Sequence, residues 1–301
     1  MKFYQYDPII IILKEPQASC DVSRESLKWF YDNFPVYCIP NIHDLETFMI
    51  ENKVDVYYQN TAGFVREYWM PISVPSVIHA IFQTHSPYGT VFTTISKYLA
   101  IENNTPVLPN ILLVDPTLEN LRSSLNIPKD AIVYGRYGGY EQFDIPYVID
   151  IVKEVARTNP LTYFIFMHTK PFLTEKCSNI IFLPGTRDIT YKTKFINTCD
   201  AMLHARNDGE TFGCACGEFA LKDKPIITSK HGDLAHIDIL RDKVIIYNNS
   251  QELHSILLNH SYITSFDMSD NGYYDYSPEK VMPILKRYIE EAVRKHQKHI
   301  T

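Results

Sequence analysis

Short apolar runs alternate with segments of helical periodicity along most of the chain. Six apolar runs of strand length occur in the second half, and several of them are apolar throughout, as strands buried on both faces of a parallel sheet are. The six predicted strands are residues 131–135, 162–168, 179–183, 201–205, 225–228 and 244–247. Because helical segments separate these strands, the pattern predicts one doubly wound α/β domain.

Two helices between these strands are predicted with their starting points. Val148, Ile151, Val152 and Val155 recur at the spacing of one helix face, and Asp144 is a plausible N-cap in front of them. A second helix is expected to begin at Asp188 and to run to about residue 198.

The first half predicts a smaller α/β domain. Apolar runs at residues 9–13, 36–39, 54–58 and 74–82 indicate strands, and apolar stripes at residues 27–34 and 45–52 indicate helices. Residues 103–128 contain four prolines and no long periodic segment, which is typical of a linker between domains, and a final helix should follow Pro278. We therefore expect a domain at residues 1–127, a second domain at residues 128–277, and a C-terminal helix at residues 278–301 that packs back toward the first domain.

Composition narrows the classes of function. The chain has 301 residues and a net charge of −6, which argues against a protein whose main partner is nucleic acid. Its six cysteines are scattered, so reduced thiols in the cytoplasm are expected rather than a disulfide framework or a zinc module. The apolar run at residues 9–13 is too short for a signal segment or a membrane span, and no integral membrane segment is expected.

Positively charged side chains follow successive strands of the second domain. In open parallel sheets, ligands bind beyond the carboxyl ends of the strands, at the point where the strand order reverses. Loops after strands are polar in any case, so chance also explains a row of cations there. Arg136 and Arg206 carry more weight, because the usual 3-2-1-4-5-6 order places them on either side of the reversal. The full row is Arg136, His168, Lys170, Arg187, Arg206, Lys230 and His231.

The loop after the fourth predicted strand carries a second signal. Gly209 allows a tight turn at the start of a helix expected near Thr211, where the amides of residues 211–213 would lack partners and could bind a phosphate. Glu210 stands at that helix start, where a glutamate is often only a capping charge. Glu218 lies inside an otherwise small and apolar helix face, where a carboxylate is costly without partners, and sugar hydroxyls would be suitable ones.

These residues resemble a known family. Gly-Glu-Thr-Phe-Gly at residues 209–213 followed by Glu218, with seven residues between the two glutamates, resembles the E-x7-E motif of retaining GT-B glycosyltransferases. Residues 133–139 resemble the first strand and Gly-Arg turn of their donor domain, and residues 223–228 resemble the strand after the motif helix. The chain is most similar to small enzymes of this kind from polysaccharide gene clusters and large DNA viruses, and the similarity covers residues 73–257.

The resemblance implies two Rossmann-like domains that face a cleft, the N-terminal one reduced. It implies transfer of a hexose or pentose, with retention, from a UDP- or GDP-linked sugar to a glycan or another hydroxyl acceptor, without metal or cofactor. Glu210 and Arg136 would be catalytic, Glu210 on the donor sugar and Arg136 on the diphosphate, and Glu218 would take the ribose hydroxyls. The other donor-binding residues would be Gly138, Gly139, Lys170, Arg187, Arg206, Gly209, Thr211, Phe212 and Gly213. His79, Tyr88 and Gly89 would contact the sugar or the acceptor.

One departure and two alternatives remain open. The family commonly has a lysine a few residues after the arginine of the first turn, which is absent here, and either Lys170 or Arg206 would have to replace its charge. A nucleotide-sugar epimerase of the same architecture, or an inactive nucleotide-sugar-binding subunit, would share most of these features. The sequence names neither the base, the sugar, the acceptor nor the oligomeric state.

Other residues have more ordinary interpretations. Cys214 and Cys216 are expected to be buried packing positions in the motif helix. His231 and His236 would either line the cleft or cap loops. Tyr273, Tyr274 and Tyr276 are expected in a packed loop beneath the last helix, with stacking on sugar rings as the alternative.

Overall fold

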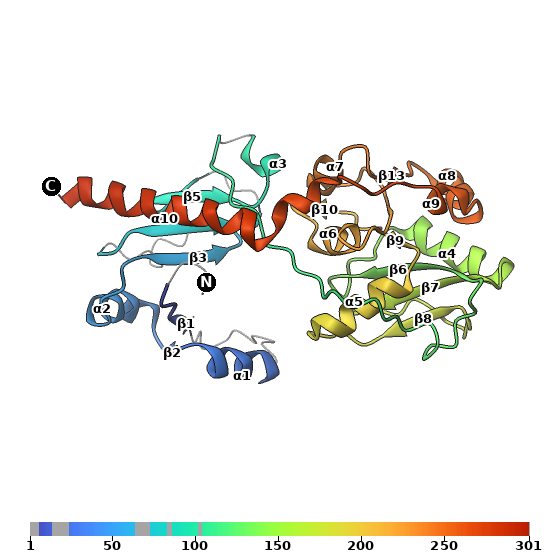
Figure 1. Cartoon of the computed structure of the whole chain (residues 1–301), viewed down its shortest axis with the longest axis horizontal. Helices are drawn as coiled ribbons and strands as arrows, with labels where there is room; N and C mark the ends of the chain where they lie inside the picture. Colours follow the sequence, from blue (N-terminus) through green and yellow to red (C-terminus); the bar gives the residue numbers. More distant parts are fainter. Residues whose placement is uncertain (1–5, 14–23, 64–72, 83–85, 102–103, 301) are drawn as a thin grey trace. The chain divides into compact units, whose positions relative to one another are not determined.

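The computed structural model of the chain describes residues 6–13, 24–63, 73–82, 86–101 and 104–300 (Figure 1). The chain divides into two compact units. Unit 1 comprises Met1–Ala80, Thr84–Thr93 and Lys286–Thr301, and unit 2 comprises Ile81–Gln83 and Thr94–Leu285.

Unit 2 is built on a parallel sheet of six strands in the order β13-β11-β9-β6-β7-β8. In chain order these strands are β6 (Ile132–Tyr137), β7 (Thr162–Met167), β8 (Ile180–Leu183), β9 (Ala201–Leu203), β11 (Ile226–Thr228) and β13 (Ile245–Ile246). All six predicted strands are confirmed, with ends that differ by one or two residues. When the six strands are numbered in chain order and read across the sheet from β8, their order is 3-2-1-4-5-6. The strand order therefore reverses between β6 and β9, as predicted.

Helices cover both faces of this sheet because successive strand residues point to opposite sides. Val133 of β6 and Ile165 of β7 belong to one apolar cluster, whereas their neighbours Tyr134 and Phe164 belong to another. The first cluster packs against α5 (Ile189–Thr198) and α6 (Cys214–Ala220), and the second against α4 (Pro146–Thr158) and α8 (Ser250–Leu258). The remaining short elements of the unit are α3 (Lys97–Ala100), β10 (Gly209–Glu210), β12 (Asp233–Leu234), α7 (Ala235–Leu240), α9 (Ser261–Thr264) and the 3₁₀ helix η4 (Gly272–Tyr276).

The two predicted helix starts have different outcomes. Asp188 caps α5, since its carboxylate accepts hydrogen bonds from the amides of Thr190 and Tyr191. The cap predicted at Asp144 is wrong, because Pro146 fixes the first turn of α4 and Ile145 occupies the N-cap position. Asp144 Oδ1 instead accepts a hydrogen bond from the Asn207 amide at 2.8 Å, which ties the start of α4 to the loop after β9.

The proline-rich segment packs along α5 within unit 2. Residues 106–120 contain neither helix nor strand beyond one isolated bridge at Val107. The amides of Asp115 and Leu121 donate to the hydroxyls of Thr193 and Thr198 on α5. Side chains of a helix thus satisfy backbone groups that an irregular segment leaves unpaired.

Unit 1 contains two small sheets. Strands β1 (Ile10–Leu13) and β2 (Val36–Ile39) pair in parallel, and β3 (Tyr57–Thr61), β4 (Ser76–Ala80) and β5 (Val91–Thr94) form the second sheet. The four predicted strands are confirmed, although β3 begins three residues later than expected, and β5 was not predicted. The helical elements are α1 (Arg24–Asn33), the 3₁₀ helix η2 (Ile42–Asp44) and α2 (Leu45–Glu51).

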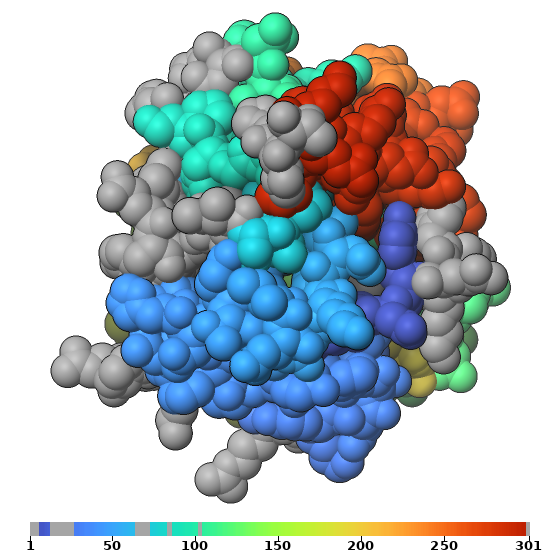
Figure 2. Space-filling model, turned by 90° about the vertical axis from the view of Figure 1, so that its left-hand side faces the viewer, coloured from blue at the N-terminus to red at the C-terminus, as the bar shows by residue number. Residues whose placement is uncertain are grey.

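The predicted final helix is present as α10 (Pro278–Ile300). Its residues from Lys286 onward are grouped with unit 1, where His296 Nε2 lies 3.2 Å from the Ser73 carbonyl oxygen. Figure 2 faces this unit and shows the red end of α10 on the same surface as its blue and cyan residues. Within the described ranges, no helix combines the length and the apolar character needed to cross a bilayer.

Candidate functional site

The loop after β9 lies at the carboxyl edge of the sheet, where the strand order reverses. Gly209 adopts φ +64°, and a β-carbon there would collide with the backbone of Asp233. This close approach allows β10 to pair in parallel with β12, so that the Asp233 amide donates to the Asp208 carbonyl at 2.8 Å. Gly209 is therefore required for the path of the loop.

The motif helix begins later than the sequence predicted. Its start was expected near Thr211, but α6 begins at Cys214, with Gly213 as N-cap at φ +78°. Residues 209–210 pair with β12 instead of joining the helix, and the left-handed turn at Gly213 then starts the helix. The amides of residues 211–213 donate no hydrogen bond to any residue that the structure describes. A row of amides without a described acceptor therefore precedes the helix.

Tyrosines of η4 hold this row in place. The Tyr273 hydroxyl donates to the Phe212 carbonyl at 2.6 Å, and the buried Phe212 ring packs edge-on against Tyr273 and Tyr276. Tyr274 donates to Asp223 Oδ1. These contacts agree with the packed-loop interpretation of the tyrosines.

Glu210 is held from two sides. Its Oε1 lies 3.3 Å from His204 Nε2, and its Oε2 accepts a hydrogen bond from Arg206 Nη1 at 3.2 Å. Burial alone would raise the pKa of Glu210, but the hydrogen bond from His204 and the positive charge of Arg206 act in the other direction, and the pKa is lowered. The side chain is therefore an ionised carboxylate.

His204 belongs to a buried chain of hydrogen bonds that sequence reasoning missed. His204 Nδ1 lies 2.8 Å from Thr228 Oγ1, and His236 Nε2 lies 3.0 Å from the same oxygen. His236 neither caps a loop nor lines the cavity described below; it is fully buried on α7, and burial lowers its pKa to about 3. His204 directly follows β9, Thr228 ends β11 and His236 lies on α7, so no local sequence pattern links the three residues.

Glu218 lies on α6 and is paired on one side only. Lys192 Nζ of α5 donates to its Oε1 at 2.6 Å, whereas its Oε2 is buried with no hydrogen-bond partner in the described part of the chain. Burial raises the pKa of Glu218 to about 8 and lowers the pKa of Lys192. Oε2 is therefore the carboxyl atom left for a hydrogen bond with a ligand.

Arg136 is the second-last residue of β6 and is anchored by two contacts. Its Nη1 donates to Thr169 Oγ1 at 2.6 Å and its Nη2 to the Gly139 carbonyl at 2.9 Å. Burial lowers the pKa of Arg136 to about 10, against the attraction of Glu210 and Asp144. A β-carbon on Gly138 would lie 2.9 Å from the guanidinium, so this glycine leaves room for the arginine.

The other cations of the predicted row lie in different settings. Lys170 pairs with Glu141 at 2.8 Å, and both side chains are exposed. Arg187 is also exposed. Arg206 forms an ion pair with Glu210, and the Nε of Arg206 is buried with no hydrogen-bond partner among the described residues. Of the two residues considered for the missing lysine, Arg206 thus contacts the motif glutamate and Lys170 contacts a surface glutamate.

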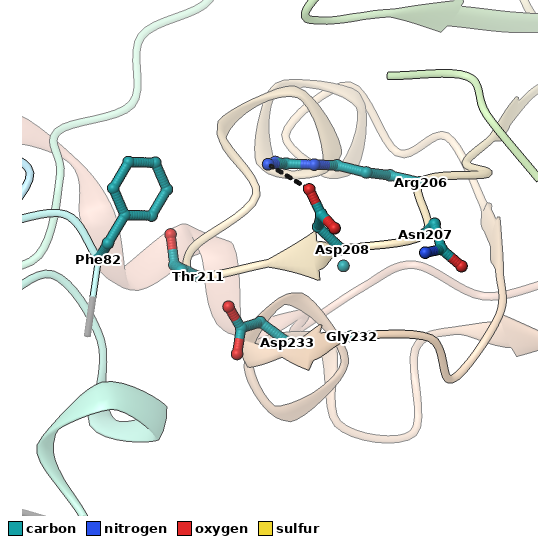
Figure 3. Close-up of a pocket in the computed structure, with 8 residues that line it drawn as sticks. Phe82, Arg206, Asn207, Asp208, Thr211, Gly232 and Asp233 are labelled. Atoms are coloured by element: carbon teal, nitrogen blue, oxygen red, sulfur yellow. Dashed lines mark ion pairs between the residues drawn. The ribbon is translucent and has the colours of Figure 1, made fainter. Parts of the chain in front are cut away.

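A cavity of about 420 Å³ opens beside the motif loop in unit 2 (Figure 3). Figure 3 shows the ion pair of Arg206 and Asp208. Thr211 and Asp233 also line the cavity. The two aspartates can accept hydrogen bonds from hydroxyl groups, and Arg206 can bind an anion. The cavity is lined by Phe82, Arg206, Asn207, Asp208, Gly209, Thr211, Gly232 and Asp233.

The residues assigned to the acceptor side lie in unit 1. His79 is buried on β4, with Nδ1 2.7 Å from the Tyr58 hydroxyl, and burial raises the pKa of Tyr58 to about 12. Tyr88 packs against Phe92 of β5, and Gly89 has φ +80°. These residues gather around strands β3 to β5.

The cysteine prediction is half right. Cys216 is fully buried in α6, as expected. Cys214 is exposed at the first residue of the same helix.

Comparisons with known proteins address the fold. No family model matches the sequence, and no curated protein matches it. Solved structures do match. A glycosyltransferase from Rickettsia africae superimposes with a TM-score of 0.71 at 10% identity, covering 97% of this chain and 92% of the other. HepE (Alr3699) of Anabaena, solved in complex with UDP, gives 0.66 at 14% identity, covering 93% and 99%.

This chain has the GT-B glycosyltransferase fold. WaaG, a glycosyltransferase involved in lipopolysaccharide biosynthesis, also shares it, with a TM-score of 0.57 at 12% identity over 85% of this chain and 86% of WaaG. In unit 2, the strand order reverses between β6 and β9, and the loop after β9 lies at the carboxyl edge of the sheet, where open parallel sheets bind ligands.

Proposed function

We propose that the protein is a retaining glycosyltransferase that moves a hexose or pentose from a nucleotide-diphosphate sugar to a hydroxyl group of a glycan or another acceptor. One observation carries the proposal. The amides of residues 211–213 have no described acceptor, and they lie in the sequence between an ionised Glu210 and a Glu218 whose Oε2 has no described partner. Amides at the start of a helix bind phosphate, and carboxylates on either side accept hydroxyl groups.

Each residue then has a role in donor binding. The amides of residues 211–213, with Arg136 and Arg206 nearby, bind the diphosphate. Glu210 accepts hydrogen bonds from hydroxyls of the transferred sugar, and Glu218 Oε2 accepts one from the ribose while Lys192 holds Oε1. The donor sugar extends into the cavity beside Asp208 and Asp233, which also accept hydroxyl hydrogen bonds.

In the proposed reaction, the bond between the anomeric carbon and the diphosphate oxygen breaks as the acceptor oxygen bonds to the same face of the sugar. The leaving diphosphate takes the acceptor proton. The protein contributes orientation and fixed positive charge, which are the large terms in transfers of this kind. Because arginines supply that charge, the proposal includes neither metal nor cofactor.

The donor and setting are proposed from the neighbouring structures and the sequence. HepE was solved with UDP-glucose and with UDP and glucose, and GtfA was solved with UDP and GlcNAc, so a UDP-linked sugar is the first donor to test and a GDP-linked sugar the second. His79, Tyr88 and Gly89 are proposed for the acceptor side. We place the reaction in the assembly of a glycan in the cytoplasm, in keeping with the scattered cysteines.

The test begins with a thermal-shift panel of UDP- and GDP-linked sugars. A donor that raises the melting temperature is then incubated with candidate sugar acceptors, and free nucleotide and the configuration of the product are measured. Nucleotide release that depends on the acceptor, with the anomeric configuration kept, supports the proposal. Conversion of the donor sugar without an acceptor indicates an epimerase, and donor binding without turnover indicates an inactive binding subunit.

A further inference from the structure

Four side chains form an unbroken line from the donor site into the core of unit 2. Glu210 Oε1 lies 3.3 Å from His204 Nε2, His204 Nδ1 lies 2.8 Å from Thr228 Oγ1, and Thr228 Oγ1 lies 3.0 Å from His236 Nε2. Thr228 and His236 are fully buried, and His204 is 5% exposed. Two imidazoles thus share a single hydroxyl group.

Counting protons restricts the directions of these hydrogen bonds. A carboxylate only accepts, so the contact with Glu210 requires a proton on His204 Nε2. The Thr228 hydroxyl has one proton to donate. If it donates to His204 Nδ1, then His236 Nε2 donates to the Thr228 oxygen, and both imidazoles are neutral with their protons on Nε2.

The two other arrangements are less favourable. When His204 carries protons on both nitrogens and Thr228 donates to His236, the proton of His236 sits on Nδ1, which is buried with no partner among the described residues. An unpaired buried N–H group is costly. When Thr228 donates instead to the Ser229 carbonyl, the distance is 3.4 Å, beyond the usual range for a hydroxyl donor, and His204 again needs two protons.

Neighbouring groups also hold His204 and Glu210. The Tyr247 hydroxyl donates to the His204 carbonyl at 2.9 Å, and Arg206 Nη1 donates to Glu210 Oε2. The His204 and His236 rings lie 4.8 Å apart, and burial keeps His236 neutral. His204 is therefore held by three hydrogen bonds, at its backbone carbonyl, at Nδ1 and at Nε2.

We propose that Thr228 and His236 are positioning residues that hold His204 with its proton on Nε2, and that His204 in turn fixes Oε1 of Glu210 toward the donor sugar. This rests on the proposed function, because the sugar contact of Glu210 is part of it. The relay explains why the site contains two fully or nearly buried histidines that need not touch substrate.

The first test locates the protons without any ligand. Nitrogen-15 NMR of the imidazole groups in the folded protein at neutral pH, with the His204 signals assigned by their loss in His204→Gln, is expected to show a protonated Nε2 and an unprotonated Nδ1 at His204. A proton on His204 Nδ1 in the wild-type protein overturns the proposal, whatever the variants do.

The second test compares two substitutions at Thr228 that separate hydrogen bonding from packing. Thr228→Val keeps the shape and removes the hydroxyl, whereas Thr228→Ser keeps the hydroxyl and removes a methyl group. We expect Thr228→Val to weaken UDP-glucose binding by about tenfold, the value of about one hydrogen bond, and to leave UDP binding unchanged. Thr228→Ser should bind both ligands like the wild type. The opposite order, with a larger loss in Thr228→Ser, would show a packing role and overturn the proposal.

A double variant tests whether the effect passes through Glu210. In a Glu210→Gln background, Thr228→Val should cause no further loss of UDP-glucose affinity, and an additive loss contradicts the relay. If the wild type binds none of the UDP- or GDP-linked sugars, the proposed function fails, and the NMR result alone then decides the proton positions.

Discussion

Lys192 Nζ donates to Glu218 Oε1 at 2.6 Å, and the second carboxylate oxygen of Glu218 is buried with no described partner. A half-paired carboxylate in the core is unfavourable for the ligand-free protein. A hydroxyl group that donates to Oε2 would remove this cost, so the pair favours a ligand with a hydroxyl at that point.

The first prediction follows from that free oxygen. Glu218→Ala should weaken UDP binding by about tenfold or more, because it removes the carboxyl group that hydrogen-bonds the ribose. Isothermal calorimetry with UDP measures this. Glu141→Ala is the matched control, since Glu141 also pairs with a lysine but at an exposed position, and its UDP affinity should equal that of the wild type. Wild-type affinity in Glu218→Ala would refute the ribose assignment.

A second prediction concerns pH. Burial raises the pKa of Glu218 from its ordinary value of 4.5 to about 8. Between these two pH values, the folded protein keeps a proton on Glu218 that the unfolded chain has lost. The stabilising effect of that proton is complete below pH 4.5 and is lost as pH rises through about 8. Glu218→Gln cannot lose this proton, so its melting temperature relative to the wild type should rise between pH 5 and pH 9 by ~3 °C or more. A constant difference across this range would show that the carboxyl ionises normally in the folded state.

The third prediction concerns Arg136. Its guanidinium is fixed by Thr169 Oγ1 and the Gly139 carbonyl, and a lysine cannot reproduce both contacts with one ammonium group. Arg136→Lys should therefore weaken UDP binding by about tenfold in calorimetry. Arg157→Lys on the exposed last turn of α4 is the control and should have no effect. Unchanged affinity in Arg136→Lys would place the diphosphate elsewhere.

Gly213 provides a test of the loop itself. It has φ +78°, and a β-carbon there would lie 2.9 Å from His236 Cβ and 3.0 Å from the Tyr273 hydroxyl. Gly213→Ala should lower the free energy of unfolding by ~1–3 kcal/mol and also weaken UDP binding. Cys214→Ala, one residue further on and exposed, should change stability by less than ~0.5 kcal/mol. Denaturant unfolding of both variants makes the comparison.

The proposed reaction also predicts behaviour toward chelators. Transfer should proceed at the same rate in excess EDTA, because arginines rather than a metal ion neutralise the diphosphate. An initial-rate assay with and without chelator is sufficient. A rate that falls in EDTA and returns with manganese would contradict this part of the mechanism.

The sheet of unit 2 could be predicted because its strands are mostly apolar and most of their residues are buried. The order of strands followed from general rules on parallel sheets, and it placed Arg136 and the loop at residues 204–213 near the reversal. The strand β5 was missed because it has only four residues, of which two are threonines. Local pattern alone does not separate such a run from a loop.

The errors within the site have a common cause. The helix start was placed near Thr211 because the pairing of Gly209 with Asp233 joins residues far apart in the sequence. Likewise, Lys192, Thr228 and His236 reach the two motif glutamates, directly or through His204, from other elements. Sequence patterns identified residues that carry the chemistry, but not the residues that hold them.

The clamp of Tyr273 on the Phe212 carbonyl has a consequence for ligand binding. The loop is fastened by a residue sixty-one positions further along the chain. The conformational entropy of the amide row is therefore already lost when the chain folds, before any ligand binds. A nucleotide that enters meets donors already preorganised, and little of its affinity is spent on ordering the protein. Removing the hydrogen bond from Tyr273 would therefore not slow a chemical step directly. It would weaken the binding of every phosphate-bearing ligand by a similar factor.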